Sequence, residues 1–237
     1  FFNLIKFYMS KKYENICKKE NIKLTNLGLS NHSFGNVSIR VNHHTFFIKP
    51  SGIDVKNSKN KIYPLVDIRT GKVINKSKLK PSVDTPTHRK IYSEYKQIKS
   101  IAHCHSLYAT AWAQASKPIP LLGTTHADYW NSSIPVTRQI TKKELRNYEF
   151  NIGKIICEKL SKAKIDIKSC PGLLVSGHAQ FSWSTSQSGA VKNSNLIEQV
   201  AQMAFMSIKI GINRKIPKFI SDFHFNRKHG KKKYYFR

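Results

Sequence analysis

Acidic residues, closely spaced cysteines and long apolar runs are all scarce in this 237-residue sequence. The four cysteines, Cys17, Cys104, Cys157 and Cys170, form no CxxC pair, which excludes a scaffold stapled by disulfides and indicates reduced thiols in a cytoplasmic protein. No apolar run approaches the roughly 20 residues that span a bilayer, and the apolar opening FFNLIKFYM lacks a small-residue cleavage site. We therefore expect no membrane partner and no signal peptide.

Acidic residues number 13 against 41 lysines and arginines, so the formal net charge is +28. A charge of this size is typical of nucleic-acid-binding proteins. The alternative is a compositional bias, because lysine, asparagine and isoleucine are abundant everywhere and the lysines are scattered along the chain. No RNA-recognition, KH or zinc-finger signature accompanies them. We expect incidental contact with polyanions but no specific nucleic-acid partner.

Helical and extended patterns alternate along the whole chain. The predicted helices cover residues 3–20, 84–95, 107–115, 141–163 and 195–210, and the predicted extended segments cover 45–52, 61–75, 100–105 and 171–184. The segment 61–75 is a hairpin pattern, and 171–184 is one strand that runs through a polar break into another. Neither a repeat of 20–50 residues nor a Pro/Gly/Ser linker interrupts this order. We predict a single α/β domain, residues 1–237, built in layers.

Two predicted helices have detailed signatures. Thr141 and Glu144 form a capping box at the start of 141–163. Apolar periodicity predicts that one side of each helix is buried. The residues expected on these buried sides are Leu145, Tyr148, Ile152, Ile155, Ile156 and Leu160 in the first helix, and Leu196, Ile197, Val200, Ala204, Phe205 and Ile208 in the second. Ser106 is the expected N-cap of the helix over 107–115.

The segment IAHCHS carries the first candidate for chemistry. In a strand His103 and His105 point to one side and Cys104 to the other, where packing is its expected role. Two imidazoles at this spacing can share one ion, but an HxH pair alone is more often structural or simply exposed. His178 follows another apolar strand, and Asp84 opens a predicted helix. Three imidazoles with an open position match a catalytic divalent-metal site, if these residues meet in the fold.

Eight motifs occur in the order found in the L-ribulose-5-phosphate 4-epimerases, a branch of the class II aldolase family. They are SFGNVSIR, FIKPSGID, KPSVDTPTHRKIY, IAHCHSLYATAWAQ, LGTTHADYW, IPVTR, PGLLVSGH and RKHGKKKYY. The sequence resembles this family from about residue 27 to residue 235, and KPSVDTPTH with GTTHADY is typical of the epimerase branch. The resemblance implies a three-layer α/β/α fold with a central mixed, mostly antiparallel sheet. It also implies a cytoplasmic homotetramer with active sites between subunits.

The resemblance implies a reaction and a role for each matching residue. The reaction is epimerisation at C4 of L-ribulose 5-phosphate to D-xylulose 5-phosphate by retro-aldol and aldol steps. The alternative is an aldolase that releases its fragments from another phosphorylated ketose. His103, His105 and His178 resemble ligands of Zn²⁺, or of Mn²⁺ or Co²⁺, and Asp84 resembles the acidic residue beside the metal that is a ligand in the substrate-free state. Asp128 and Tyr235 resemble the two proton donors and acceptors, so the tail 221–237 completes the site. The residues that resemble substrate and phosphate contacts are Gly35, Asn36, Lys49, Ser51, Gly52 and Ser82.

Each of these residues also has a structural explanation when it is taken alone. Asp84 is a candidate helix N-cap, Gly35–Asn36 a turn and Lys49 one more solvated lysine. The remaining histidines His88, His126, His224 and His229 are expected on helix surfaces or as supporting groups rather than as ligands. Only their joint occurrence in order favours the functional interpretation.

Several positions depart from the pattern of the epimerases. Val83 stands where a second serine is usual, Ala179 and Gln180 stand where glycine and proline are usual, and YYFR replaces the closing YYGQ. A missing hydroxyl at position 83 costs about 1–3 kcal/mol if a polar group is left unpaired. If the glycine needs a positive φ, Ala179 is strained. We expect a less efficient enzyme sooner than an inactive one.

Overall fold

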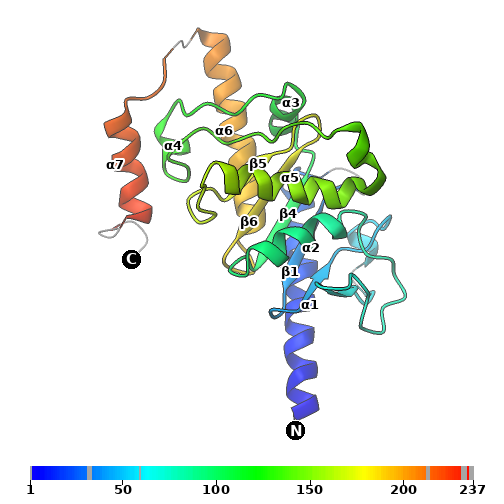
Figure 1. Ribbon diagram of the computed structural model, residues 1–237. Helices are drawn as coiled ribbons and strands as arrows, with labels where there is room; N and C mark the ends of the chain where they lie inside the picture. The colour runs from blue at the N-terminus through cyan, green and yellow to red at the C-terminus, as the bar shows by residue number, and fades with distance from the viewer. Residues whose placement is uncertain (1, 31–33, 59, 212–213, 231–233, 235–237) are drawn as a thin grey trace.

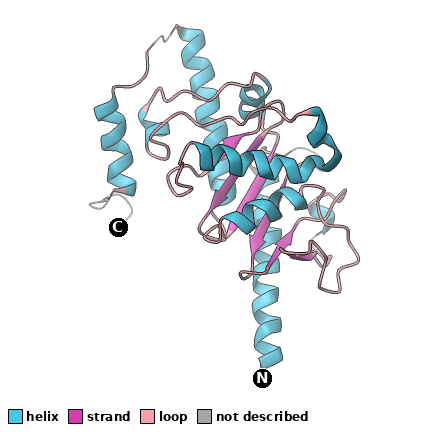
Figure 2. Cartoon of the chain, viewed as in Figure 1, coloured by secondary structure: helices cyan, strands magenta, loops and turns pink. Residues whose placement is uncertain are grey.

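The computed structural model describes residues 2–30, 34–58, 60–211, 214–230 and 234. Within these ranges six strands form one sheet, in the order β3-β2-β1-β4-β6-β5 (Figures 1 and 2). The strands are β1 (Asn36–Arg40), β2 (Thr45–Ile48), β3 (Leu65–Asp67), β4 (Ser100–Cys104), β5 (Gly172–Leu174) and β6 (Gln180–Ser184). All of these strand pairs are antiparallel, and an isolated bridge between Val136 and Leu174 is parallel. The sheet is therefore mixed but mostly antiparallel, as predicted.

Helices cover both faces of the sheet, which confirms the predicted three-layer arrangement. The helices are α1 (Phe2–Asn26), α2 (Thr85–Glu94), α3 (Leu107–Gln114), α4 (Thr124–Ala127), α5 (Tyr148–Lys162), α6 (Ala190–Ile210) and α7 (Lys218–His229), with 3-10 turns at Lys56–Ser58 and Lys142–Asn147. In Figure 1, α2 and α5 cross the front of the sheet, α1 and α6 lie behind it, and α7 stands to one side next to α4. None of the helices in the described ranges combines the length and apolar content of a bilayer-spanning segment.

Alternation along the strands divides the core into two faces. Ile101 and Phe181 pack with α2 and α5 on one face, whereas Ala102 and Cys104 pack with α1 and α6 on the other. Burial raises the pKa of the Cys104 thiol to about 12, so it stays protonated. Cys104 is therefore a packing residue on the face opposite His103, as the strand pattern predicts.

The helix predictions were right in type but imprecise at the ends. The helix that begins in the amino-terminal segment continues to Asn26, and α6 begins at Ala190 rather than at residue 195. Leu145 is 58% exposed because it lies in the 3-10 turn, whose three residues per turn put it out of phase with the buried side of α5. Phe205 and Ile208 are 42% and 46% exposed, since the last turns of α6 extend past the buried part of the helix. The strand β1 was not predicted.

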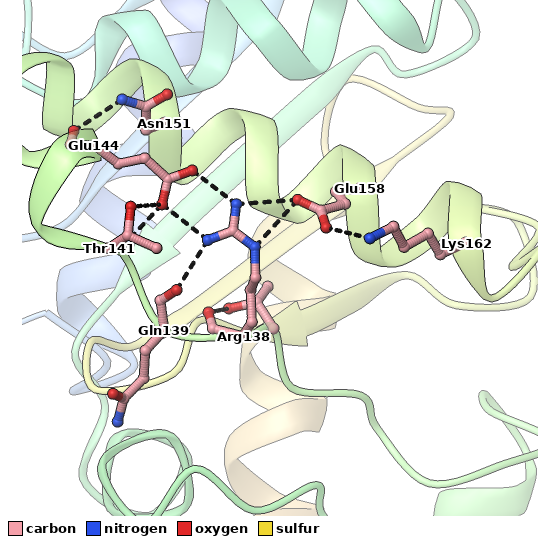
Figure 3. Close-up of polar contacts among 8 residues, drawn as sticks. Arg138, Gln139, Thr141, Glu144, Asn151, Glu158 and Lys162 are labelled. Atoms are coloured by element: carbon pink, nitrogen blue, oxygen red, sulfur yellow. Dashed lines mark hydrogen bonds and ion pairs between the residues drawn. The ribbon is translucent and has the colours of Figure 1, made fainter.

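The predicted capping box is present, but it opens the 3-10 turn Lys142–Asn147 that precedes α5, and an arginine binds the same glutamate (Figure 3). The Thr141 backbone N–H donates to Glu144 Oε2 at 2.9 Å. Arg138 donates to both oxygens of Glu144, at 2.8 and 2.7 Å, and to Glu158 on α5 at 3.1 and 3.2 Å. The guanidinium and the capping bonds hold the pKa of Glu144 well below its usual range. This anchor sets the position of Tyr148, the first residue of α5.

Candidate metal and substrate site

Three histidines from separate segments meet at one end of the sheet. His103 lies near the end of β4, His105 just after it, and His178 in the turn between β5 and β6. Antiparallel pairing of β4 with β6 places His103 opposite Phe181, which brings that turn back beside the end of β4. Each histidine offers one ring nitrogen, and these atoms all lie within 4.8 Å of one another. Three imidazoles at this separation could hold a divalent cation with a position left open.

The surroundings keep these imidazoles neutral. Burial, with smaller effects from the neighbouring histidines, lowers the pKa of His103 and of His178 to about 3, and burial also lowers the pKa of His105. The ring of His103 stacks on Phe181 with centroids 4.1 Å apart. Its Nδ1 lies 2.9 Å from the Gln180 carbonyl oxygen, to which it donates, so Nε2 is left as the ligand atom. Neutral imidazole with one committed N–H is the form that binds a metal.

Asp84 lies beside this cluster, held by an amide from β1. Asn36 Nδ2 donates to Asp84 Oδ2 at 2.7 Å, and Asn36 itself pairs with His103 in the sheet. The side chain of Asp84 caps no backbone N–H of α2, so its structural explanation as an N-cap does not account for it. Burial lowers the pKa of His105 and of His178, and the negative charge of Asp84 offsets part of that lowering. Its carboxylate oxygens are not part of the group of possible ligand atoms that lie within 4.8 Å of one another, which comprises one nitrogen from each of the three histidines.

The six expected substrate contacts lie at the same end of the sheet. Gly35 and Asn36 lead into β1, the loop 49–52 follows β2, and Ser82 precedes α2. Because β1 is antiparallel to both β2 and β4, its start lies beside their ends. The 49–52 and 80–84 loops are joined by two backbone hydrogen bonds, from Ser51 N to Lys80 O at 2.9 Å and from Ser82 N to Lys49 O at 3.0 Å. The fold thus gathers these residues around the histidine cluster.

Two features of these loops need special residues. Gly35 has φ +79°, and a Cβ there would lie 3.0 Å from the carbonyl oxygen of His103, so the close approach of the two strands requires glycine. Lys49 is buried, which lowers the pKa of its ammonium group, while the charges of Asp54 and Asp84 raise it. Lys49 is therefore no solvated surface lysine. It brings a cation into the same end of the sheet as the three imidazoles.

The departures from the epimerase pattern at Ala179 and Gln180 are accommodated locally, and positions 235–237 of the closing YYFR lie outside the described residues. The condition for strain at Ala179 is not met, because the positive φ in this turn, +69°, belongs to Gly177 and not to Ala179. Gln180 takes part in the site, because its carbonyl accepts from His103 and its Nε2 donates to Ser106 Oγ at 2.6 Å. The side chain of Val83 is 63% exposed.

The carboxylate of Asp128, the residue that follows α4, is bound by side chains of α7. Lys228 Nζ lies 2.9 Å from Asp128 Oδ2, and Arg227 and His224 contact Oδ1 at 3.0 and 3.1 Å. Partial burial raises the pKa of this carboxyl, but the hydrogen bonds from Lys228, His224 and Arg227 together bring it below its usual range. In the described part of the chain its side-chain bonds go to α7, and none reaches the three histidines. Tyr235 lies outside the described residues.

The other histidines divide into two kinds. His224 and His229 both contact Asp128, as supporting groups were expected to do. His88 and His126 are buried in the protein interior and are not helix-surface groups. Burial lowers their pKa values to about 3 and about 4.

A carboxylate from α6 caps the helix after the HCH segment. Ser106 was the expected cap, but its side chain caps no backbone N–H. Instead Glu198 accepts hydrogen bonds from Ser106 Oγ at 2.6 Å and from the backbone N–H groups of Tyr108 and Ala109, both at 2.9 Å. Nothing in the sequence singles out this glutamate, which lies more than 80 residues further along the chain. Tyr148 was likewise predicted only as a core residue, yet its ring lies against His178 with centroids 6.2 Å apart.

The family model for the Class II Aldolase and Adducin N-terminal domain matches residues 19–205. The chain belongs to this family. A Mycoplasma pneumoniae protein named probable L-ribulose-5-phosphate 4-epimerase is 41% identical over 235 aligned positions, and the match covers 96% of this chain and 97% of the relative. Among solved structures, an L-fuculose 1-phosphate aldolase superposes with a TM-score of 0.74 at 22% identity, over 90% of this chain and 94% of the other. The aldolase/epimerase/decarboxylase homologue YgbL of Klebsiella pneumoniae gives 0.69 at 19% identity, over 90% and 97%. These two structures share the fold, and the predicted family is confirmed.

Proposed function

We propose that this protein is a metal-dependent L-ribulose-5-phosphate 4-epimerase, a cytoplasmic homotetramer that interconverts L-ribulose 5-phosphate and D-xylulose 5-phosphate. The observation that carries the proposal is the convergence of His103, His105 and His178, with Asp84 beside them, at the end of the sheet where the expected phosphate contacts lie. The 41% identical relative named as a probable epimerase supports the same reaction.

The chemistry explains why such a site is needed. C4 of a ketopentose phosphate carries no acidic hydrogen, because it lies two bonds from the carbonyl. Inversion therefore proceeds by breaking the C3–C4 bond, turning the glycolaldehyde phosphate over while it stays bound, and re-forming the bond on its other face. Cleavage leaves negative charge on the oxygens of the three-carbon fragment. A divalent cation, Zn²⁺ in the first place, held by the three histidines with Asp84 beside them, supplies Lewis-acid stabilisation of that charge.

Two proton-transfer groups follow from the same scheme. The C4 hydroxyl loses its proton on cleavage and regains one after the aldehyde has turned, so one group is needed on each side. Asp128 and Tyr235 are proposed for these roles. Because the Asp128 carboxylate is bound by α7 and makes no hydrogen bond to the three histidines within the described residues, Asp128 and Tyr235 are proposed to serve the histidine cluster of a neighbouring subunit. Hence the homotetramer has its sites between subunits.

The phosphate of the substrate must stay bound while the fragment turns. The buried ammonium of Lys49, the hydroxyls of Ser51 and Ser82, and the loop backbone at Gly35, Asn36 and Gly52 are proposed as its seat. Charge-assisted hydrogen bonds of this kind hold phosphate firmly. Retention of this fragment distinguishes an epimerase from an aldolase.

Elemental analysis of the purified protein, followed by turnover of L-ribulose 5-phosphate with and without chelator, tests the proposal. We expect a stoichiometric divalent metal, loss of D-xylulose 5-phosphate formation with chelator, and recovery with Zn²⁺, Mn²⁺ or Co²⁺. A protein that binds none of these ions would contradict the proposal. Accumulation of free glycolaldehyde phosphate in place of D-xylulose 5-phosphate would identify an aldolase instead.

A further inference from the structure

A basic cavity lies at the end of the sheet opposite the histidine cluster. It has a volume of about 450 Å³ and lies between the turn that joins β1 to β2, the turn after β3, and the helices α2 and α5. The opposite ends of β1 and β2 carry the candidate substrate contacts, so the length of these strands separates the two sites. In the described part of the chain no acidic residue lines this cavity. Its lining includes His43, His44, Arg69, Arg89, Lys90 and Phe150.

Two hydrogen-bonded turns hold the basic cavity in shape. The side-chain oxygen of Asn42 accepts the backbone N–H groups of His44 and Thr45, at 2.8 and 3.0 Å. The backbone N–H of Ile68 donates to the His44 carbonyl at 2.7 Å, which joins the first turn to the second. Both His43 and His44 are exposed, so a ligand in the cavity can reach their imidazoles.

Arg89 is a positioned cation rather than a mobile surface arginine. Its Nε donates to the Ile68 carbonyl at 3.0 Å, and its Nη2 donates to the Arg69 carbonyl at 2.8 Å. A Cβ at position 71 would collide with Arg89 Nη1, so Gly71 leaves room for the guanidinium. Both acceptors are uncharged carbonyls, which orient the planar guanidinium without cancelling its charge.

Two acidic groups near the basic cavity have partners of their own. Glu94 pairs with Lys90 at 2.5 Å along α2. The Asp67 carboxylate accepts the backbone N–H and the hydroxyl of Thr70, at 2.7 and 2.8 Å, within its own turn. These bonds are the main cause of the lowered pKa of Asp67, and the charge of the neighbouring arginine has a smaller effect. The two arginines are therefore the cations best placed to meet an anion, and their forked donors match the geometry of phosphate.

An aromatic ring completes the lining of the basic cavity. Phe150 lies in the first turn of α5 and is 45% exposed. A single exposed phenylalanine is ordinary on a protein surface. Here the ring shares a cavity with arginines and imidazoles. Proteins hold nucleotides with this combination, because bases stack on aromatic rings and cations bind the phosphate.

We infer that the basic cavity binds a nucleoside phosphate, with the phosphate at Arg69 and Arg89 and the base against Phe150. The volume of the cavity lies within the roughly 300–1,000 Å³ of small-molecule sites. The cavity stands apart from the three histidines, so this inference holds or fails independently of the proposed function.

Isothermal titration calorimetry with AMP at physiological salt tests the phosphate contact, because salt screens the general attraction of a chain with a net charge of +28. We expect one saturable site per chain. Arg69→Gln should weaken AMP binding by roughly 10–100-fold, the size of one lost charge-assisted hydrogen bond. Arg214→Gln is the matched control, since it removes the same charge from an exposed position between α6 and α7 and should leave AMP binding unchanged.

Phe150→Ala separates the base from the phosphate. Loss of one stacked base should weaken AMP binding by roughly 5–100-fold, whereas the affinity for inorganic phosphate should not change. Phe219→Ala is the matched control, because Phe219 is 74% exposed on α7 and does not line the cavity. Arg69 and Phe150 are both exposed, so both variants should fold, which circular dichroism checks.

The outcomes separate a built site from general electrostatic attraction. The inference is overturned if no saturable AMP binding is found, or if Arg69→Gln and Arg214→Gln have the same affinity for AMP. The latter result is also expected if AMP binds at the histidine end of the sheet. Equal AMP affinities of Phe150→Ala and Phe219→Ala would overturn the assignment of a nucleoside. Competition with a single-stranded oligoadenylate identifies the source: tighter binding of AMP supports a free nucleotide, and tighter binding of the oligoadenylate supports the same site occupied by an RNA strand.

Discussion

Glu198 lies on α6 but caps the N-terminus of a different helix, α3. Its replacement by alanine should therefore destabilise the protein. The carboxylate on α6 accepts two backbone N–H groups and one hydroxyl at the start of α3. Ala109 is fully buried, so its N–H has little access to water once the acceptor is removed. Loss of one capping acceptor costs about 0.5–2 kcal/mol, and loss of a negative charge at a helix N-terminus costs a further ~0.3–1 kcal/mol.

With two backbone donors affected, we expect Glu198→Ala to lower the free energy of unfolding by about 2–3 kcal/mol. For a chain of this size each 1 kcal/mol shifts Tm by roughly 2–4 °C, so Tm should fall by roughly 5–10 °C. Glu198→Gln should also destabilise, because whichever way the amide turns, its NH₂ faces a donor. Thermal unfolding followed by circular dichroism measures both changes.

Gln199→Ala provides the control, since Gln199 is the next residue of α6 and is exposed. It should leave Tm nearly unchanged. If Glu198→Ala has the same Tm as Gln199→Ala, then Glu198 is not the cap of α3 and the reasoning is refuted. Because α3 begins two residues after His105, we also expect Glu198→Ala to weaken Zn²⁺ binding.

Three further predictions follow from separate sites. His103→Asn should lower bound metal well below stoichiometric; full occupancy by elemental analysis would argue against a ligand role. Burial holds the pKa of His126 at about 4 against 6.5 when unfolded, so the folded state binds fewer protons in that window and stability is lost as pH falls through it. At 1.36 kcal/mol per pKa unit this is up to about 3 kcal/mol, so urea unfolding should depend less on pH in His126→Gln, and parallel curves would contradict this. Arg138→Lys cannot reproduce the paired bonds to Glu144, so its Tm should be lower at low salt and approach that of the unmodified protein at high salt.

Local patterns predicted those features that depend on residues close together in the chain. The alternation through Ile101, Ala102, His103 and Cys104 placed His103 and Cys104 on opposite faces, as the two core clusters confirm. The capping box of Thr141 and Glu144 is present. These two predictions are correct because side-chain direction in a strand and hydrogen bonding in a first helical turn depend only on residues a few positions apart. Ordered motifs also identified the family, which the match over residues 19–205 confirms.

Contacts between distant segments decided the rest. No pattern within a few residues links Glu198 to the start of α3, Asn36 to Asp84, or Asp128 to α7. Exposure at Phe205 and Ile208 likewise depends on how far the buried part of α6 extends, and exposure at Leu145 on the 3-10 turn that replaces the first turn of the predicted helix. Apolar periodicity therefore overestimated both buried sides. Residue types and their order along the chain were therefore enough to identify the family and the candidate metal ligands. Which donor meets which acceptor follows from strand pairing and helix packing, because hydrogen bonds form only between atoms that the fold brings within about 3 Å.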